Sequence, residues 1–265
     1  MIKLLSDKDI KFFLNTIKKA GSTALQMQRG KLNIRRKEDC SIVTEVDIWV
    51  QNFLMEEISC KFNSFQFVCE EKTNMDMNFP GDKVSVIIDP IDGTAVFSMH
   101  LPLWCISIGI FQGTVPLYGF VFSPGSDLLF HTDNDYSYLN GTRLISDPDI
   151  KIDNETNIFY SSEIRDVSIK FPGKIRNLGS TALHACLTAD NRRNRLLAFI
   201  GKSFLWDWAG AVPVILKAGV KIKYLNGNDL DYMEIIKNDF ALKDYAVAYN
   251  ALDFNSVKNI FRRRN

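Results

Sequence analysis

The 265-residue sequence contains only three histidines and five cysteines, and no two cysteines form a Cys-x-x-Cys pair. Zinc sites are built mainly from these side chains, so a zinc site is not expected. The cysteines are odd in number and widely spaced, unlike the disulfide framework of a small secreted protein. We therefore expect reduced thiols in the cytoplasm, and oxygen ligands for any bound metal.

The sequence also lacks an excess of charge of either sign. It has 32 Lys and Arg against 31 Asp and Glu, a formal net charge of +1. Such a chain has no overall positive field that would hold polyanions, so general nucleic-acid binding is not expected. Charged residues within the first nine positions leave no space for the apolar segment of a signal peptide.

One uncharged segment, residues 101–126, is long enough to cross a bilayer. Prolines and glycines interrupt it, and Gln112-Gly113-Thr114 near its middle is typical of a turn. Residues that favour β-strands stand on both sides of this turn. The segment therefore predicts a buried hairpin, and no association with a membrane is expected.

The spacing of apolar residues predicts helices first and a meander of strands after them. Helices are expected over residues 7–30 and 44–61, with Thr44 as an N-cap, and strands over 65–69, 84–88, 104–111 and 117–122. Later strands, over 158–160, 196–200, 220–224 and 246–249, alternate with helices over 181–189, 206–218 and 252–262. We place a subdomain boundary between the two patterns, which divides the chain into residues 1–145 and 146–265.

Residues 84–94 carry the clearest sign of chemistry. An apolar strand runs directly into the sequence Asp-Pro-Ile-Asp-Gly-Thr of residues 89–94. Asp followed by Pro favours a type I turn, which would let Asp89 and Asp92 share one cation. Gly93 permits backbone N–H groups to approach an anion closely. The segment predicts a metal site beside a phosphate site, with an ordinary polar turn as the alternative.

Further carboxylates lie where a two-metal phosphoryl site would need them. Glu70 and Glu71 directly follow the strand over 65–69. Asp207 stands in Trp-Asp-Trp-Ala-Gly at the start of a helix, and Asp47 in Thr-Glu-Val-Asp at the start of another. Each has an ordinary alternative: a solvated strand end for the glutamates, and helix capping for the aspartates.

In this order, the motifs Thr-x-x-Asp, Glu-Glu, Asp-Pro-Ile-Asp-Gly-Thr and Trp-Asp-x-Ala-Gly resemble those of the inositol monophosphatase family. The resemblance implies a mixed α/β (α+β) fold, the layered αβαβα sandwich that this family shares with fructose-1,6-bisphosphatases. It also implies a Mg²⁺-dependent, lithium-sensitive phosphoric monoester hydrolase. Such an enzyme would act on a small phosphorylated metabolite and form a homodimer.

The resemblance assigns a role to each matching residue. Two or three Mg²⁺ ions are expected on four carboxylates and one main-chain carbonyl, those of Glu70, Asp89, Asp92, Asp207 and Ile91. The groups expected to orient and deprotonate the attacking water belong to Asp47, Thr94 and Glu70. Contacts to the substrate are expected from Gly93, Thr94, Gly179, Ser180 and Thr181. Glu71 is expected to support the metal ligands without binding metal itself.

The substrate side departs from the family's pattern. Ala198, Phe199 and Ile200 stand where family members that hydrolyse inositol phosphates carry a hydroxyl-binding glutamate, and His184 stands where an asparagine is usual. Inositol specificity is therefore not predicted. Two other branches of the superfamily stay as alternatives, the 3'(2'),5'-bisphosphate nucleotidases and the histidinol-phosphate phosphatases. A non-catalytic partner of the transcription machinery is the alternative from a different class.

A basic cluster, Arg192-Arg193-Asn194-Arg195, replaces a glycine-containing turn of the family. Guanidinium groups bind phosphate in a bidentate manner, so the cluster would suit a second phosphate of a nucleotide substrate. An ordinary solvated loop is the alternative.

Overall fold

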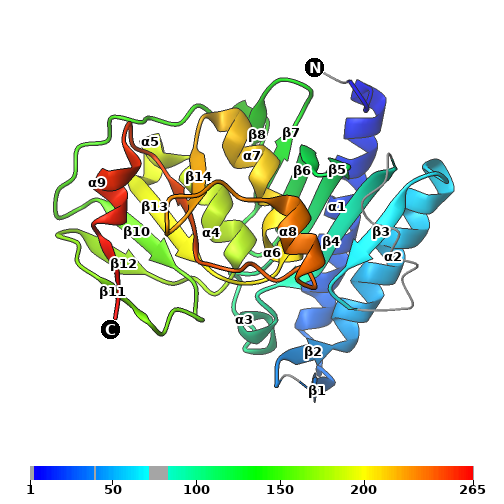
Figure 1. Cartoon of the computed structure of the whole chain (residues 1–265). Helices are drawn as coiled ribbons and strands as arrows, with labels where there is room; N and C mark the ends of the chain where they lie inside the picture. Colours follow the sequence, from blue (N-terminus) through cyan, green and yellow to red (C-terminus); the bar gives the residue numbers. More distant parts are fainter. Residues whose placement is uncertain (1–2, 39, 72–82, 265) are drawn as a thin grey trace.

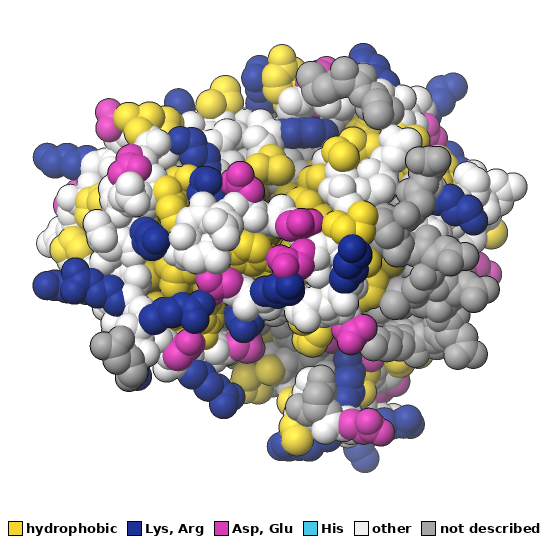
Figure 2. Space-filling view, viewed as in Figure 1, with side chains coloured by type: hydrophobic (Ala, Val, Ile, Leu, Met, Phe, Trp, Pro, Cys, Tyr) yellow, Lys and Arg dark blue, Asp and Glu magenta, His cyan; other side chains and the backbone are white. Residues whose placement is uncertain are grey.

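We describe a computed structural model of the chain, which defines residues 3–38, 40–71 and 83–264. Helices and sheets alternate in five layers, and the seven-stranded sheet and five-stranded sheet lie on opposite sides of a middle layer of helices (Figure 1). This is the layered αβαβα sandwich predicted from the sequence. Acidic and basic side chains are interspersed over the face seen in Figure 2, as expected for a net charge close to zero.

The first layer consists of the long helices α1 (Asp7–Gln28) and α2 (Glu45–Lys61). Ser6 caps α1 and Thr44 caps α2, each in a capping box with an aspartate three residues later. Both helices bury an apolar stripe against one face of the larger sheet. The two predicted helices are thus confirmed, and α1 ends two residues before the predicted Gly30.

The strands of the larger sheet come from residues 66–143. Its strands, in spatial order, are β3 (Gln66–Cys69), β4 (Val84–Asp92), β5 (Cys105–Gln112), β6 (Val115–Ser123), β7 (Leu128–Thr132), β8 (Ser137–Leu139) and β9 (Thr142–Arg143). β3 is parallel to β4, and the other neighbours are antiparallel. Val86 and Ile88 pack towards α1 and α2, whereas Ile87 packs towards the middle helices. Both faces are covered, which explains the unbroken apolar runs.

The predicted hairpin over residues 101–126 is confirmed as β5 and β6, which pair through the turn at Gly113. Among the described residues, no helix has the length and apolar character needed to cross a membrane. All five cysteines are free. Three of them are buried, and Cys40 and Cys60 are exposed.

The end of β4 differs from the prediction. A type I turn was expected after a strand ending at residue 88, and this is wrong because β4 continues to Asp92. Asp89 pairs with Ser107 and Asp92 with Cys105, so β4 has one more residue than β5 across this stretch. This is a β-bulge, and Pro90 lies inside it, where a missing N–H is tolerated. The bulge brings the two aspartates together as the turn would have done.

The middle layer consists of α4 (Thr181–Thr188), α6 (Leu205–Ala209) and α7 (Ala211–Ala218). A single helix was predicted over 206–218, but it divides at Gly210. Gly109 and Gly119 lie beneath this junction, on β5 and β6. A Cβ atom on Gly119 would stand 1.9 Å from the Gly210 carbonyl oxygen, and one on Gly109 would stand 2.4 Å from that of Ala209. The helix backbone therefore rests directly on the strand backbones.

The smaller sheet follows in the second half of the chain. Its strands, in spatial order, are β12 (Lys174–Arg176), β10 (Asn157–Tyr160), β13 (Leu196–Gly201), β15 (Ala246–Tyr249) and β14 (Lys221–Tyr224). The change of sheet lies between Arg143 and Asn157, around the proposed subdomain boundary. Since α4, α6 and α7 pack on both sheets, the division into residues 1–145 and 146–265 stays a prediction.

The last layer contains α9 (Phe254–Lys258) and the paired strands β11 (Val167–Ile169) and β16 (Phe261–Arg263). The helix predicted over 252–262 is therefore only partly correct, because residues 261–263 form a strand. Phe261 and Val167 are buried against the smaller sheet, and this packing favours the strand. The remaining short elements are β1 (Ile34–Arg36), β2 (Ile42–Thr44), α3 (Thr94–Ser98), α5 (Asn191–Asn194) and α8 (Tyr232–Lys237).

Candidate metal centre

Three carboxylates converge at the bulged end of β4. Asp89 and Asp92 come from the bulge, and Asp207 comes from α6, which the sheet glycines allow to approach closely. One carboxylate oxygen from each lies within 4.8 Å of the others. Asp89 and Asp92 are buried, and Asp207 is partly exposed. The sequence motifs had placed these residues in one site, and the fold brings them together.

The electrostatics of this cluster favour a cation. Burial raises the pKa of Asp92 to about 6 and that of Asp207 to about 7. Burial also raises the pKa of Asp89, and the negative charges of Glu70, Asp92 and Asp207 raise it further. The Oδ2 atom of Asp89 is buried without a hydrogen-bond partner among the described residues. Hard oxygen ligands that repel one another in this way fit a divalent cation such as Mg²⁺.

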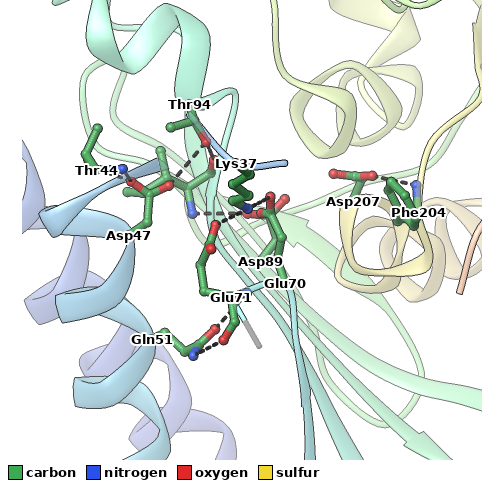
Figure 3. Close-up of polar contacts among 11 residues, drawn as sticks. Lys37, Thr44, Asp47, Gln51, Glu70, Glu71, Asp89, Thr94, Phe204 and Asp207 are labelled. Atoms are coloured by element: carbon green, nitrogen blue, oxygen red, sulfur yellow. Dashed lines mark hydrogen bonds and ion pairs between the residues drawn. The ribbon is translucent and has the colours of Figure 1, made fainter. Parts of the chain in front are cut away.

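Glu70 and Glu71 lie beside this cluster at the end of β3, where Lys37 contacts both of them (Figure 3). The Lys37 Nζ atom lies 3.1 Å from Glu70 Oε1 and 2.5 Å from Glu71 Oε1. Burial raises the pKa of Glu70 to about 7, although Lys37 opposes this shift. Burial alone would lower the pKa of Lys37, but the two glutamates raise it overall. The sequence analysis missed Lys37, because no local pattern links it to glutamates that follow 33 and 34 positions later.

Asp47 both caps a helix and contacts Thr94, its predicted partner in orienting water. Its Oδ2 atom accepts the Thr44 main-chain N–H at 2.8 Å, which caps α2. Its Oδ1 atom accepts a hydrogen bond from the Thr94 hydroxyl at 3.2 Å, and this hydroxyl also lies 3.0 Å from the Ile91 carbonyl oxygen. Burial raises the pKa of Asp47 to about 6. The capping alternative and the predicted pairing with Thr94 are therefore both present.

Asp92 is held by the first turn of α4. Its carboxylate accepts hydrogen bonds from the Ser180 hydroxyl at 2.5 Å, the Thr181 N–H at 3.2 Å and the Ala182 N–H at 2.6 Å. Gly179 precedes them with φ of +97°, a conformation that glycine adopts easily. Ser180 and Thr181 were predicted to contact the substrate, and that contact stays a prediction. The structure shows that they fix the position of Asp92.

His184 lies in the core rather than in the metal centre. It is fully buried, and its Nε2 atom accepts the Leu178 N–H at 2.7 Å. Burial lowers its pKa to about 3, so the ring is neutral. Through this hydrogen bond it holds the loop that precedes α4.

Gln51 on α2 is a second residue that the sequence analysis missed. It is fully buried, and its side-chain amide forms two hydrogen bonds with the main chain of Glu71. Nε2 donates to the Glu71 carbonyl at 2.5 Å, and Oε1 accepts the Glu71 N–H at 3.1 Å. Gln51 therefore fixes the chain at the point where both glutamates leave β3.

Replacing Gln51 with leucine is expected to weaken both the fold and the metal centre. Leucine has a similar size but leaves two main-chain groups unpaired, so the free energy of unfolding should fall by about 2 to 4 kcal/mol. Mg²⁺ affinity should fall about 10- to 100-fold, as is usual when a group that orients metal ligands is lost. Denaturant unfolding and titration calorimetry measure the two effects.

Gln66→Leu is the control, because Gln66 stands at the other end of β3 from the glutamates, and its side-chain amide donates to the Ser85 hydroxyl on β4 rather than to the main chain of Glu71. It should lose stability without losing Mg²⁺ affinity. Unchanged Mg²⁺ binding in Gln51→Leu would show that Gln51 does not position the glutamates.

Comparison with known proteins agrees with this geometry. The model of the inositol monophosphatase family matches residues 6–244. The chain belongs to the inositol monophosphatase family. It is 28% identical over 233 residues to inositol monophosphatase 1 of Solanum lycopersicum, which covers 82% of this chain and 85% of the relative. It is 28% identical over 241 residues to a fructose-1,6-bisphosphatase/inositol-1-monophosphatase of Aquifex aeolicus, covering 85% and 89%.

Solved structures of this family share the fold. An IMPase/NADP phosphatase complexed with Mg²⁺ and phosphate superposes with a TM-score of 0.76 at 19% identity, covering 96% of this chain and 94% of that one. The family and the fold class predicted from the motifs are thereby confirmed. The predicted enzyme class, a phosphoric monoester hydrolase, is that of the named relatives.

Proposed function

We propose that this chain is a Mg²⁺-dependent phosphatase that hydrolyses the phosphate monoester of a small metabolite. The observation that carries the proposal is the convergence of Asp89, Asp92 and Asp207 within 4.8 Å, next to the hydrogen-bonded pair of Asp47 and Thr94. The retained carboxylates support an enzyme over a non-catalytic partner, because without a cation they would repel one another at a cost in stability.

Five groups are proposed to hold the metal: the carboxylates of Glu70, Asp89, Asp92 and Asp207, and the carbonyl of Ile91. When bound, Mg²⁺ supplies positive charge that polarises the phosphoryl group and lowers the pKa of water. We place two or three ions there. Four ionised carboxylates carry a charge of −4, which two divalent cations would balance, and this supports more than one ion.

Asp47, Thr94 and Gly93 are proposed to orient the attacking water and to bind the phosphate. The single proton of the Thr94 hydroxyl has two acceptors within reach, Asp47 Oδ1 at 3.2 Å and the Ile91 carbonyl oxygen at 3.0 Å. With the Ile91 carbonyl bound to metal, the hydroxyl would donate to Asp47, and its oxygen would accept a hydrogen bond from water and orient it. A proton released by the attacking water would pass to Thr94 as the Thr94 proton passes to Asp47. The pKa of Asp47, raised to about 6 by burial, makes it a stronger base than an exposed aspartate. The main-chain N–H groups of Gly93 and Thr94 are proposed to bind phosphate oxygens, and the φ of +95° at Gly93, which glycine adopts easily, supports a close approach of the backbone to an anion.

The test is phosphate release from a panel of substrates in the presence of Mg²⁺, with and without lithium. The panel contains inositol 1-phosphate, adenosine 3',5'-bisphosphate, histidinol phosphate, fructose 1,6-bisphosphate and NADP. Release from one compound that requires Mg²⁺ and is inhibited by lithium is the expected result, and it also decides between the branches of the superfamily. No release combined with no Mg²⁺ binding would overturn the proposal and favour the non-catalytic alternative.

We also propose a homodimer in the cytoplasm, without general affinity for nucleic acid. Met99 and Leu101 expose apolar side chains directly after α3, and such a surface supports self-association. Exposed free Cys40 and Cys60 suit a reducing compartment. Sedimentation equilibrium should give twice the mass of one chain, and a single-chain mass would contradict the dimer. Cell fractionation tests the location.

A further inference from the structure

The structure forms a cavity that the proposed function does not use. It has a volume of about 380 Å³, within the range of small-molecule sites, and it lies between the β8–β9 hairpin and the junction of α4 with α5. Two segments line it, residues 139–145 and residues 189–193. The fold thus brings together parts of the chain about 50 residues apart.

Three arginines line this cavity: Arg143 from β9, and Arg192 and Arg193 from α5. Within the described part of the chain, none of them forms an ion pair with a carboxylate. The Arg143 guanidinium lies 3.5 Å from the centre of the Tyr136 ring. Asp190 is the single acidic residue among the described residues that line the cavity, and together they carry a net charge of +2. Asp190 interacts electrostatically with Arg193, and the two positive charges left over favour an anion between the arginines.

Arg195 is different from its neighbours in the basic cluster. It adopts φ of +54° and forms an ion pair with Asp153 at 2.6 Å. It also does not line the cavity. The structure therefore separates the four-residue cluster seen in the sequence into one arginine with a structural partner and two that face the cavity.

Apolar groups form another part of the lining. Leu139, Leu144 and Ala189 are buried and border the cavity. Inorganic anions gain nothing from such a surface, whereas an organic ligand buries its carbon atoms against it. The guanidinium groups match phosphate in charge and in hydrogen-bond geometry. The combination fits a ligand with a phosphorylated end and an apolar or planar body.

The cavity is separate from the metal centre. The first turn of α4 holds Asp92, and Ala189, at the other end of α4, borders the cavity. An eight-residue helix is about 12 Å long. In Figure 1, α5 and β8 lie near the top of the view. Helix α3, which directly follows Asp89 and Asp92 in the chain, lies in the lower half. The arginines therefore do not adjoin the phosphate position at the metal centre.

We propose that this cavity binds a small organic phosphate. Arg143, Arg192 and Arg193 bind its phosphate groups, and the apolar wall formed by Leu139 and Leu144 contacts its body. The proposal is independent of the phosphatase activity.

The test uses α,β-methylene-ADP as the probe, on the full chain with Mg²⁺. This compound has no phosphate monoester bond, so the proposed activity does not consume it. Titration calorimetry compares the wild type with the double variant Arg192→Gln, Arg193→Gln. We expect saturable binding by the wild type and at least about tenfold weaker binding by the variant, since each lost charge-assisted bond has a substantial effect.

The double variant Arg165→Gln, Arg262→Gln is the matched control. It removes the same charge from exposed positions on and beside the paired strands β11 and β16, which do not line the cavity. It should bind the probe as the wild type does, and both double variants should retain the wild-type phosphatase rate. Equal affinity in all three proteins, or equal weakening in both variants, would overturn the proposal.

A second measurement distinguishes this cavity from the metal centre, which also attracts phosphate. In protein labelled with ¹⁵N-arginine, the side-chain N–H signals of Arg143, Arg192 and Arg193 should shift and saturate with the probe. Those of Arg165 and Arg262 should stay in place. Small unsaturated shifts at every exposed arginine would mean non-specific binding and would overturn the proposal. Equally tight binding of methylenebisphosphonate would overturn the part assigned to the apolar wall.

Discussion

Replacing Asp89 with asparagine is expected to lower the turnover number at least about 1000-fold while the metal-free protein becomes more stable. A ligand to the catalytic cations contributes several kcal/mol to stabilisation of the transition state, and each 1.36 kcal/mol corresponds to a factor of ten in rate. Asparagine keeps the shape of the side chain and its Oδ1 contact with the Ile91 N–H, which measures 3.0 Å. The fold should therefore persist.

The gain in stability follows from the surroundings of this carboxylate. Asp89 is buried among Glu70, Asp92 and Asp207, and its Oδ2 atom lacks a partner among the described residues. Neutralising it removes repulsion and an unfavourable desolvation, which should raise the free energy of unfolding without metal by about 1 kcal/mol. In the wild type, Mg²⁺ should raise the melting temperature, because it binds the native state. In the variant this increase should be much smaller.

Calorimetric melting in EDTA and in Mg²⁺, together with turnover at saturating substrate, measures both effects. Asp149→Asn is the control, since Asp149 is exposed and the change in charge is the same. Turnover of Asp89→Asn within tenfold of the wild type would contradict the assignment of Asp89 as a metal ligand.

Gly119→Ala is expected to destabilise the protein by about 3 kcal/mol or more, although it adds a single methyl group. That methyl group would stand 1.9 Å from the carbonyl oxygen of Gly210. The obstacle is a backbone atom, which has no rotamer through which to withdraw, so α6 and α7 must move away from the sheet. A loss of this size corresponds to a melting temperature lower by roughly 6 to 12 °C.

The same displacement would move Asp207 away from Asp89 and Asp92, because Asp207 lies three residues before Gly210 on this segment. Mg²⁺ affinity should therefore fall together with stability. Differential scanning calorimetry and Mg²⁺ titration test this. Gly30→Ala is the control, since a Cβ there would stand 3.3 Å from the Met27 carbonyl oxygen, a contact that a shift of a few tenths of an ångström would relieve. A wild-type melting temperature for Gly119→Ala would show that α6 does not depend on backbone contact with the sheet.

The elements that were predicted well from the sequence are those determined by interactions between residues close together in the chain. The capping of α2 by Thr44 and Asp47 can be read from four consecutive residues, and the α1 stripe from the helical period. The metal ligands Asp89, Asp92 and Asp207 could be grouped because their motifs, taken together, are distinctive. Helix and strand positions near these motifs were therefore predicted with small errors at the ends.

The features that the sequence did not predict depend on distant partners. Whether Asp89 and Asp92 form a turn or a bulge is decided by the register of β4 against β5. Residues 261–263 join a strand because β11, more than 90 positions earlier, is available for pairing. Lys37 and Gln51 have no local pattern that connects them to Glu71, which only the fold brings close.

The two contacts of Asp47 have a consequence for how this protein can change over time. Asp47 ties the start of α2 to Thr94, so its loss would cost stability as well as activity. Asp89 is the reverse, since its presence costs stability unless a cation is bound. A descendant that no longer needed to catalyse anything would therefore lose Asp89 early and keep Asp47, and that pattern would identify a relic of the enzyme from its sequence.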